Sequence, residues 1–238
     1  MKQMSFGKRL LRILKQNVNI VCVCVGDKYN KEHVNRLYRM VKRNCSLPFS
    51  FYCISDQQQD VNTIFIDKDL DLESYWWKIC LFNLDWDTPT VYFDLDVVIH
   101  NNIDDIFDRI DDTLLTIKAE DIGEYCPYDG SPENILTVPL AVINTSIIGF
   151  VPRLHKKVYN AFLKDIDSNI VLYFGLDRFL CNNYNKFSYL QYGIDYYHRA
   201  KGYSGQLINN LNYNPDCKVC ILSQCTEQHY KGLEKYFL

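Results

Sequence analysis

Two carboxylates stand one residue apart in an otherwise apolar run of the chain. Asp94 and Asp96 lie within TVYFDLDVVI at residues 90–99, among β-branched and aromatic residues. Such a run predicts a strand buried on both faces of an α/β sheet. Buried carboxylates are costly unless they are paired or bound to a cation, so we expect them at the carboxyl end of that strand, where open α/β sheets bind ligands. Two hard oxygen donors suit Mg²⁺ or Mn²⁺ held together with a diphosphate. A polar strand end or turn without a ligand is the alternative interpretation.

The hydrophobic pattern predicts the elements that must position these carboxylates. Strands separated by helices over short spacings favour a parallel arrangement with right-handed crossovers. We expect one domain over residues 19–238, preceded by a basic segment at 1–18. The predicted strands are 19–25, 49–54, 63–66, 90–99, 114–118, 141–150 with an interruption at 144–146, 187–190 and 218–222. The predicted helices are 31–44, one capped by Ser74 and running to 81, one within 101–110, 153–165, 175–184 and one from about 226, with a long loop at 121–139.

Charge and cysteine usage narrow the class of protein. The net charge is −3, but the first 43 residues are strongly basic and the remainder is acidic, which argues against non-specific nucleic-acid binding. No signal peptide or membrane-length apolar run is recognised, so we expect a cytoplasmic protein. Residues 1–16 could form a basic amphipathic helix on an anionic membrane surface, or a simple capping helix. The ten cysteines are expected to be free thiols, and Cys217-x-x-Cys220 is expected to pack in a strand rather than bind zinc.

Acidic residues follow three of the predicted strands. Gly26-Asp27, Ser55-Asp56 and the Asp94/Asp96 pair would meet along one edge of a parallel sheet. Glycine allows a ligand to approach the backbone closely, and a strand-end Asp can bond a ribose or base edge, as in dinucleotide folds. Turn chemistry alone would also explain Asp27 and Asp56. We expect at least one of these residues to contact a nucleotide.

Four segments in order carry a resemblance to a known family. VCVCVGDKYNKEHVNRLYRMVKRN, FYCISD, SYWWKICLF and VYFDLDVVIHNNIDDIF resemble nucleotide-sugar glycosyltransferases of GT-A fold, most closely the glycogenin and bacterial galactosyltransferase-like group. The resemblance is clear over residues 19–110 and looser beyond. It implies an α/β, Rossmann-like GT-A fold with a mixed, mostly parallel sheet flanked by helices in a single domain.

The resemblance also implies roles for individual residues. In that family the Asp-x-Asp pair binds Mn²⁺ and the diphosphate of a UDP-sugar, which corresponds here to Asp94 and Asp96, with Leu95 between them at the nucleotide. The lysine ahead of the metal strand, Lys78, would approach the phosphates. Asn144 and Asp177 resemble the family's groups that face the sugar and acceptor, although they could instead satisfy a β-bulge and cap a helix. The base contacts would come from Val25, Gly26, Asp27 and Tyr29.

The carboxyl-terminal part departs from the family pattern. The family often follows its last strand with His-Gly-x-Pro-Lys-Pro, whose His is a third metal ligand and whose Lys binds phosphate. Residues 223–229, SQCTEQH, lack both residues at the expected places. His229 or His198 would then replace the third ligand, or the metal would keep more water, or the protein would bind its ligand without turnover.

Together with the Asp94/Asp96 pair, the resemblance implies a metal-dependent glycosyltransferase. It would use Mn²⁺ or Mg²⁺ to move a sugar from a UDP-sugar to a hydroxyl of a glycan, lipid or protein, with Asp177 as the base if the reaction inverts. Two alternatives remain open. One is a non-catalytic nucleotide-sugar or glycan-binding protein. The other is a phosphatase of the haloacid-dehalogenase class, in which Asp94 would be the nucleophile and Asp96 the acid/base.

Overall fold

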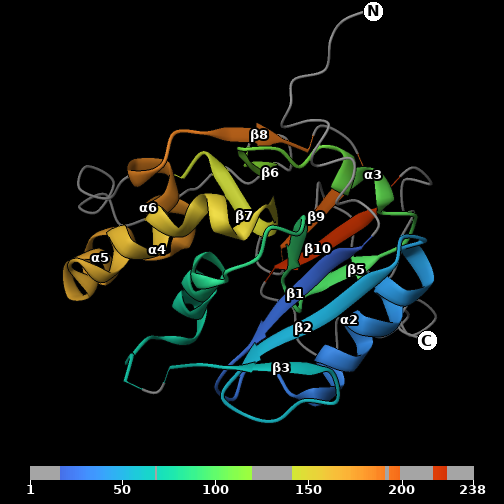
Figure 1. Ribbon diagram of the computed structural model, residues 1–238, viewed down its shortest axis with the longest axis horizontal. Helices are drawn as coiled ribbons and strands as arrows, with labels where there is room; N and C mark the ends of the chain where they lie inside the picture. The colour runs from blue at the N-terminus through green and yellow to red at the C-terminus, as the bar shows by residue number, and fades with distance from the viewer. Residues whose placement is uncertain (1–16, 68, 120–140, 191–192, 199–216, 224–238) are drawn as a thin grey trace, which may run out of the picture.

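The computed structural model describes residues 17–67, 69–119, 141–190, 193–198 and 217–223 (Figure 1). Its strands are β1 (Val18–Cys24), β2 (Phe49–Ser55), β3 (Asn62–Phe65), β4 (Thr90–Phe93), β5 (Val97–Ile99), β6 (Leu114–Lys118), β7 (Ile143–Phe150), β8 (Phe187–Tyr189), β9 (Ile194–His198) and β10 (Val219–Ser223). Its helices are α2 (Lys31–Asn44), α3 (Asp104–Asp108), α4 (Lys156–Leu163), α5 (Ile166–Tyr173) and α6 (Leu176–Asn183), and two 3₁₀ helices are η1 (Ser74–Asn83) and η3 (Pro152–His155).

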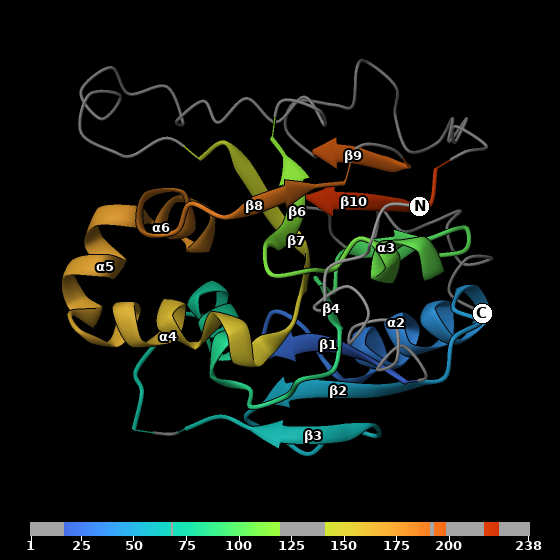
Figure 2. The ribbon, with the colours of Figure 1, turned by 45° about the horizontal axis from the view of Figure 1, so that its top comes forward.

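A mixed, mostly parallel sheet forms the centre of the fold, as predicted. Its seven strands run in the order β3-β2-β1-β4-β7-β6-β8, which Figure 2 shows from β3 at the bottom to β8 above. β1 pairs in parallel with β2 and with β4, whereas β7 is antiparallel to both β4 and β6. The carboxyl ends of β1, β2 and β4 therefore share one edge. A smaller sheet, β5-β10-β9, lies beside it.

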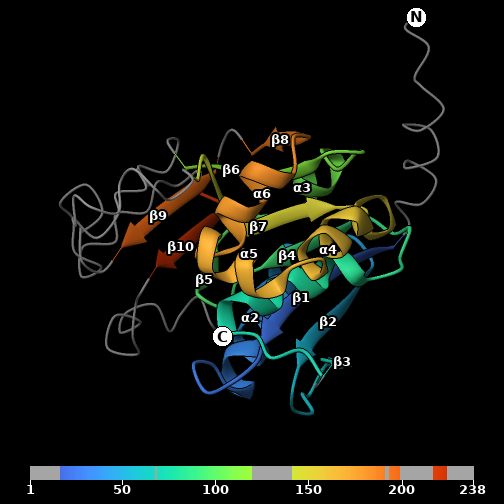
Figure 3. The ribbon, with the colours of Figure 1, turned by 90° about the vertical axis from the view of Figure 1, so that its left-hand side faces the viewer.

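Helices cover both faces of the main sheet. The amphipathic helix α2 buries Val34, Leu37 and Met40 against one face. On the opposite face, η1, α4 and α6 pack into a second apolar cluster, and Figure 3 shows α4, α5 and α6 together in front of the sheet. Asn30 caps α2, because its Oδ1 accepts a bond from the Glu32 backbone N–H at 3.0 Å. This cap determines where the loop after β1 ends and the helix begins.

The segment that carries Lys78 is a 3₁₀ helix. Trp76, Ile79 and Phe82 are all 0% exposed, and their spacing of three matches the three residues per turn of such a helix. The indole of Trp76 packs on Phe162 of α4, with ring centroids 5.0 Å apart. Burial of this stripe overrides the poorer hydrogen bonding of the 3₁₀ form and fixes the position of Lys78.

Several element boundaries differ from the sequence predictions. The single strand expected at 90–99 is wrong, because it divides into β4 in the main sheet and β5 in the small one, with a turn at 94–96. Ser74 is not the cap of its helix; Glu73 is, without a side-chain capping bond. The helix expected at 153–165 is η3 followed by α4. Neither α5 nor β9 was predicted. α5 contains no fully buried residue; Ile166, Ile170 and Tyr173 pack against the second apolar cluster while partly exposed.

His155 gives the folded state a pH dependence. Burial, reinforced by the nearby Lys157 charge, lowers the pKa of His155 to about 4, and its Nδ1 lies 2.9 Å from the Tyr184 hydroxyl. The unfolded chain takes up a proton below about pH 6.5, whereas the folded chain does so only near pH 4. We therefore expect this residue to cost on the order of 3 kcal/mol of stability between pH 6.5 and pH 4. Urea unfolding of the protein and its His155→Gln variant at several pH values measures the difference, and parallel pH profiles would contradict it.

The remaining sequence predictions concern membrane contact, the cysteines, and the segments at the two ends of the chain and at 121–139. In the described ranges no helix has both the length and the apolarity that a bilayer crossing requires. Eight cysteines in this part of the chain, Cys217 and Cys220 among them, form no disulfide. The basic segment, the long loop at 121–139 and the terminal helix lie almost entirely outside the described residues. The membrane contact and the cytoplasmic location stay predictions.

Candidate active site

The Asp94–Asp96 turn joins the two sheets. Phe93 at the end of β4 and Leu95 in the turn both belong to one apolar cluster, whereas Asp94 and Asp96 line a pocket. Two backbone bonds hold the turn: the Asp94 N–H donates to the Ser146 carbonyl at 2.9 Å, and the Leu222 N–H donates to the Asp96 carbonyl at 2.8 Å. Leu95, only 6% exposed, anchors the turn between them.

Asp94 is paired with a lysine. The Lys78 ammonium lies 2.7 Å from Oδ1 and 2.8 Å from Oδ2 of Asp94, and both side chains are 18% exposed. The Tyr92 hydroxyl also donates to Oδ1. Burial alone would lower the pKa of Lys78, but the charges of Asp94, Asp177 and Asp96 outweigh it, so its pKa is raised and the ammonium persists. Both oxygens of Asp94 are therefore already engaged.

Asp96 is electrostatically different from Asp94. The Tyr29 hydroxyl donates to its Oδ2 at 3.1 Å, but its Oδ1 is buried and has no hydrogen-bond partner in the described part of the chain. Burial and the Asp94 charge raise the pKa of Asp96 to about 6, although Lys28, Lys78 and Tyr29 oppose the shift. A buried carboxylate oxygen without a partner is unfavourable, and a divalent cation would satisfy it. Asp96 therefore fits a metal ligand better than Asp94 does.

These residues surround one pocket with a volume of about 110 Å³. We call it the Asp-x-Asp pocket; its described lining is Val23, Val25, Lys28, Tyr29, Tyr75, Lys78, Tyr92, Asp94, Leu95 and Asp96. Six of the residues singled out in the sequence converge here; they come from the loop after β1, from η1 and from the turn. Asp94 and Asp96 both border open space, so the Lys78 ion pair leaves room for a ligand.

A second hollow meets this pocket at Tyr29, which lines both. We call it the β1–β2 groove; Gly26, Asp27 and Asp56 line it together with residues of α2 and of the β2–β3 turn. Gly26 has a φ of 73°, a left-handed conformation that other residues adopt only with strain. The three residues expected at a nucleotide thus share one groove beside the predicted metal ligands.

Asn144 and Asp177 brace the rear of the site. The β6–β7 register shifts between Leu115 and Ile117, so a bulge forms in β7 after Asn144. The Asn144 Oδ1 accepts the Ser146 N–H at 2.8 Å inside this bulge. The Asp177 Oδ1 accepts the Thr145 N–H at 3.1 Å and also the Thr145 hydroxyl. Since the Ser146 carbonyl holds Asp94, this chain of bonds fixes the turn from behind.

Asp177 also lines a third hollow, together with Ala119, Gly175 and Arg178.

The two histidines considered as a third metal ligand are not both placed. His229 lies outside the described residues, and His198 is placed only by its backbone, opposite Ser223 of β10. Within the described ranges no cluster of three or more His, Cys, Asp or Glu side chains is arranged to hold a metal ion.

Several residues of the site were not singled out in the sequence. Tyr92 stands two residues before Asp94 in β4, so strand alternation could have placed it on the same face. Lys28 adjoins the Gly26-Asp27 pair, and its ammonium lies 4.7 Å from the Tyr29 ring centroid. Tyr75 is in the same 3₁₀ turn as Lys78. Gln59 carried no signal, because it reaches the groove only through the fold of the β2–β3 turn.

The arrangement of elements is similar to solved glycosyltransferases. GlyE of Streptococcus pneumoniae TIGR4 matches with a TM-score of 0.61 and 10% identity, over 93% of this chain and 61% of that one. The galactosyltransferase LgtC, in complex with donor and acceptor sugar analogues, matches with a TM-score of 0.55 and 13% identity, over 88% of both chains. The bifunctional glycosyltransferase WbbM matches with a TM-score of 0.60 and 12% identity, over 89% of this chain.

The chain has a GT-A fold. It spans 46% of the WbbM chain, so it corresponds to less than half of that protein. No family model and no curated protein sequence matches it. At these identities the similarity establishes the fold and leaves the activity to be argued from the site.

Proposed function

We propose that the chain is a metal-dependent glycosyltransferase that moves a sugar from a nucleotide-sugar, a UDP-sugar, to a hydroxyl of a glycan, lipid or protein. The observation that carries the proposal is the buried Oδ1 of Asp96, which has no hydrogen-bond partner among the described residues. Asp96 lines the same pocket as Lys78. The GT-A fold supports sugar transfer in general, since the neighbouring structures are glycosyltransferases and LgtC was solved with donor and acceptor sugar analogues.

The chemistry of the pocket suits a departing diphosphate. Asp96, with Asp94, would hold Mn²⁺ or Mg²⁺, which when bound supplies charge that stabilises the leaving phosphates. Lys78 provides a permanent positive charge at the same place and keeps Asp94 oriented. Tyr29 fixes Asp96 and lines both the pocket and the β1–β2 groove. In the groove, Gly26, Asp27 and Asp56 would contact the nucleoside, and Val25 would do so from the adjoining pocket. Asn144 and Asp177 remain our candidates for facing the sugar, and Asp177 for the base of an inverting reaction.

A sugar-nucleotide screen tests this proposal. UDP-, GDP- and CMP-sugars are incubated with the protein with and without Mn²⁺, and nucleoside diphosphate or monophosphate release is measured. We expect slow release of UDP from a UDP-sugar that depends on Mn²⁺ and stops with EDTA. Mn²⁺-dependent UDP binding without any release would favour the non-catalytic binding protein. Phosphatase activity without metal-dependent UDP affinity would favour the haloacid-dehalogenase-class alternative, to which the GT-A fold lends no support.

A further inference from the structure

One buried amide in the β1–β2 groove is not used by the proposed chemistry. Gln59 follows β2, is 5% exposed and lines the groove. Its Nε2 donates to the Ser55 Oγ at 3.0 Å and to the Gln57 carbonyl at 3.4 Å. Its Oε1 is buried and has no hydrogen-bond partner among the described residues. An amide that leaves one end unsatisfied inside a groove is unusual, because buried polar groups are nearly always paired.

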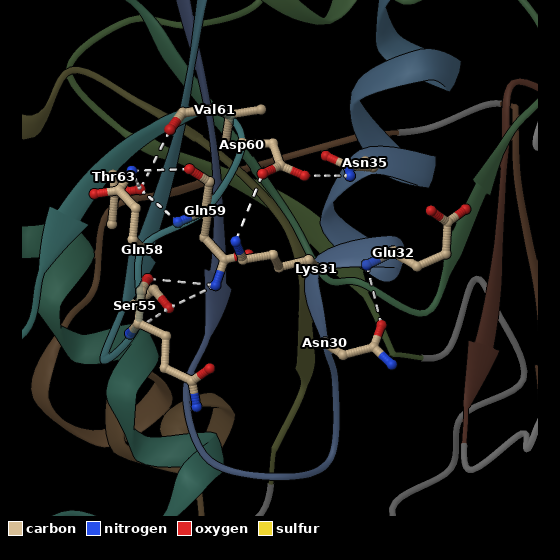
Figure 4. A network of polar contacts seen from close by, with 11 residues as sticks. Asn30, Lys31, Glu32, Asn35, Ser55, Gln58, Gln59, Asp60, Val61 and Thr63 are labelled. Atoms are coloured by element: carbon tan, nitrogen blue, oxygen red, sulfur yellow. Dashed lines mark hydrogen bonds and ion pairs between the residues drawn. The ribbon is translucent and has the colours of Figure 1, made fainter.

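The side-chain amide of Gln59 donates hydrogen bonds to the residues before and after Asp56. Ser55 and Gln57 are its two chain neighbours, and the same side-chain amide holds both. The Ser55 hydroxyl in turn donates to the Cys24 carbonyl of β1 at 2.7 Å and accepts the Gln57 N–H at 3.1 Å. The backbone that carries Asp56 is therefore clamped before and after the residue, as Figure 4 shows for the bonds around Ser55 and Gln59.

The far side of the β2–β3 turn is tied to α2. The Asp60 carboxylate accepts the Asn35 Nδ2–H at 2.9 Å and lies 3.6 Å from the Lys31 ammonium (Figure 4). The Thr63 Oγ1 accepts the Gln59 N–H at 3.0 Å. The turn is thus held both at the strand end and at the helix, so the width of the groove between them is set in advance of any ligand.

Three side chains of the groove present hydrogen-bond acceptors that the described residues leave unused. Asp27 and Asp56 make no hydrogen bond or ion pair within the described part of the chain, and the Gln59 Oε1 adds a third acceptor. A ligand that satisfies them must present N–H or O–H donors. The N3–H of uracil and the ribose hydroxyls do so, whereas a diphosphate does not. Cytosine has a lone pair at N3 in place of the donor, so a carboxylate there would repel it.

We propose that Gln59 is a positioning residue that holds the Asp56 carboxylate at the base edge of the donor and thereby sets the preference for uracil over cytosine. The inference rests on the proposed function, because it takes the ligand of the groove to be the nucleoside half of a nucleotide-sugar. It adds to that function a residue with no role in catalysis or metal binding.

Three probes with Mn²⁺ separate the two halves of the site: UDP, CDP and pyrophosphate, each titrated calorimetrically. Pyrophosphate reports the Asp-x-Asp pocket alone. In Gln59→Met, which keeps the size of the side chain and removes its amide, we expect UDP affinity to fall roughly tenfold or more, since a hydrogen bond to a charged group is lost or misplaced. We expect the UDP-to-CDP affinity ratio to approach one and pyrophosphate affinity to stay unchanged. The matched control is Gln58→Met, at an exposed neighbour, which should keep the wild-type ratio.

The possible titration results each overturn a different statement. A wild-type protein that binds neither pyrophosphate nor UDP would overturn the proposed function and this inference with it. UDP binding with an unchanged UDP-to-CDP ratio in Gln59→Met would overturn the inference alone. An equal loss of UDP and pyrophosphate would show a general structural role and would also overturn it. If Gln59→Met does not fold, Gln59→Glu keeps the shape, replaces the donor facing Ser55 by an acceptor, and is expected to give the same loss of selectivity.

Discussion

Asp96→Asn is expected to abolish metal-dependent UDP binding while the protein stays folded. The amide has the shape of the carboxylate and can still accept the Tyr29 hydroxyl bond, but it lacks the charge that would hold a cation. Loss of even an outer partner of a metal site costs 10- to 100-fold in affinity, so loss of a ligand should cost at least about 100-fold. Because burial and Asp94 raise the pKa of Asp96 to about 6, its charge at pH 7 opposes folding, and the variant should be at least as stable.

Calorimetric titration of UDP with and without Mn²⁺, together with urea unfolding, measures both parts of this result. Asp112→Asn is a matched control, because its side chain is 73% exposed and far less constrained. Its UDP affinity should equal that of the wild type. Unchanged Mn²⁺-dependent affinity in Asp96→Asn would remove Asp96 from the metal site and leave its unpartnered oxygen without an explanation.

Lys78→Met is expected to lower UDP release from a UDP-sugar by roughly 100-fold or more, the usual effect of losing one group that stabilises developing negative charge. It should also destabilise the protein, by about 2–4 kcal/mol, because Asp94 is left beside Asp96 without its cation. Steady-state release of UDP and urea unfolding of the variant measure the two effects.

A second substitution separates the effect of the Lys78 charge on UDP release from its effect on stability. In Lys78→Met combined with Asp94→Asn, the unpaired carboxylate is gone, so stability should recover while activity stays low. Lys78→Arg keeps a cation and should retain part of the activity. Wild-type turnover in Lys78→Met would show that the lysine serves the fold and has no part in the departure of the diphosphate.

Much of the fold could be predicted because it follows from local patterns. Apolar runs with β-branched residues gave β1, β2 and β6 nearly to the residue, and the stripe of Val34, Leu37 and Val41 gave α2. The strand at 90–99 was mispredicted since an apolar run carries no information on which sheet its two ends join. β5 pairs with β10, more than 100 residues later, and this distant partner pulls the second half of the run into another sheet.

The residues of the site also fall into two groups: those that the local sequence predicts and those that only the folded chain brings together. The types and spacing of Asp94 and Asp96, and their position after a buried strand, are local properties, and they predicted the pocket. The hydrogen-bond partners of the two carboxylates are not local. Lys78 of η1 binds both oxygens of Asp94, whereas Tyr29, 67 residues away in the sequence, donates to one oxygen of Asp96. The Thr145–Asp177 brace likewise joins β7 to α6.

The amino-acid sequence by itself determined the succession of buried strands, the glycine and acids at their ends, and the pair of carboxylates that suits a divalent cation. Only the tertiary structure decided that one of these acids is neutralised by a lysine, while the other keeps an oxygen with no hydrogen-bond partner in the described part of the chain. It also decided that a buried glutamine clamps the strand end beside them. The reason is physical: strand periodicity depends on neighbours two residues apart, whereas burial, charge pairing and hydrogen-bond satisfaction depend on groups that meet only when the sheets and helices pack.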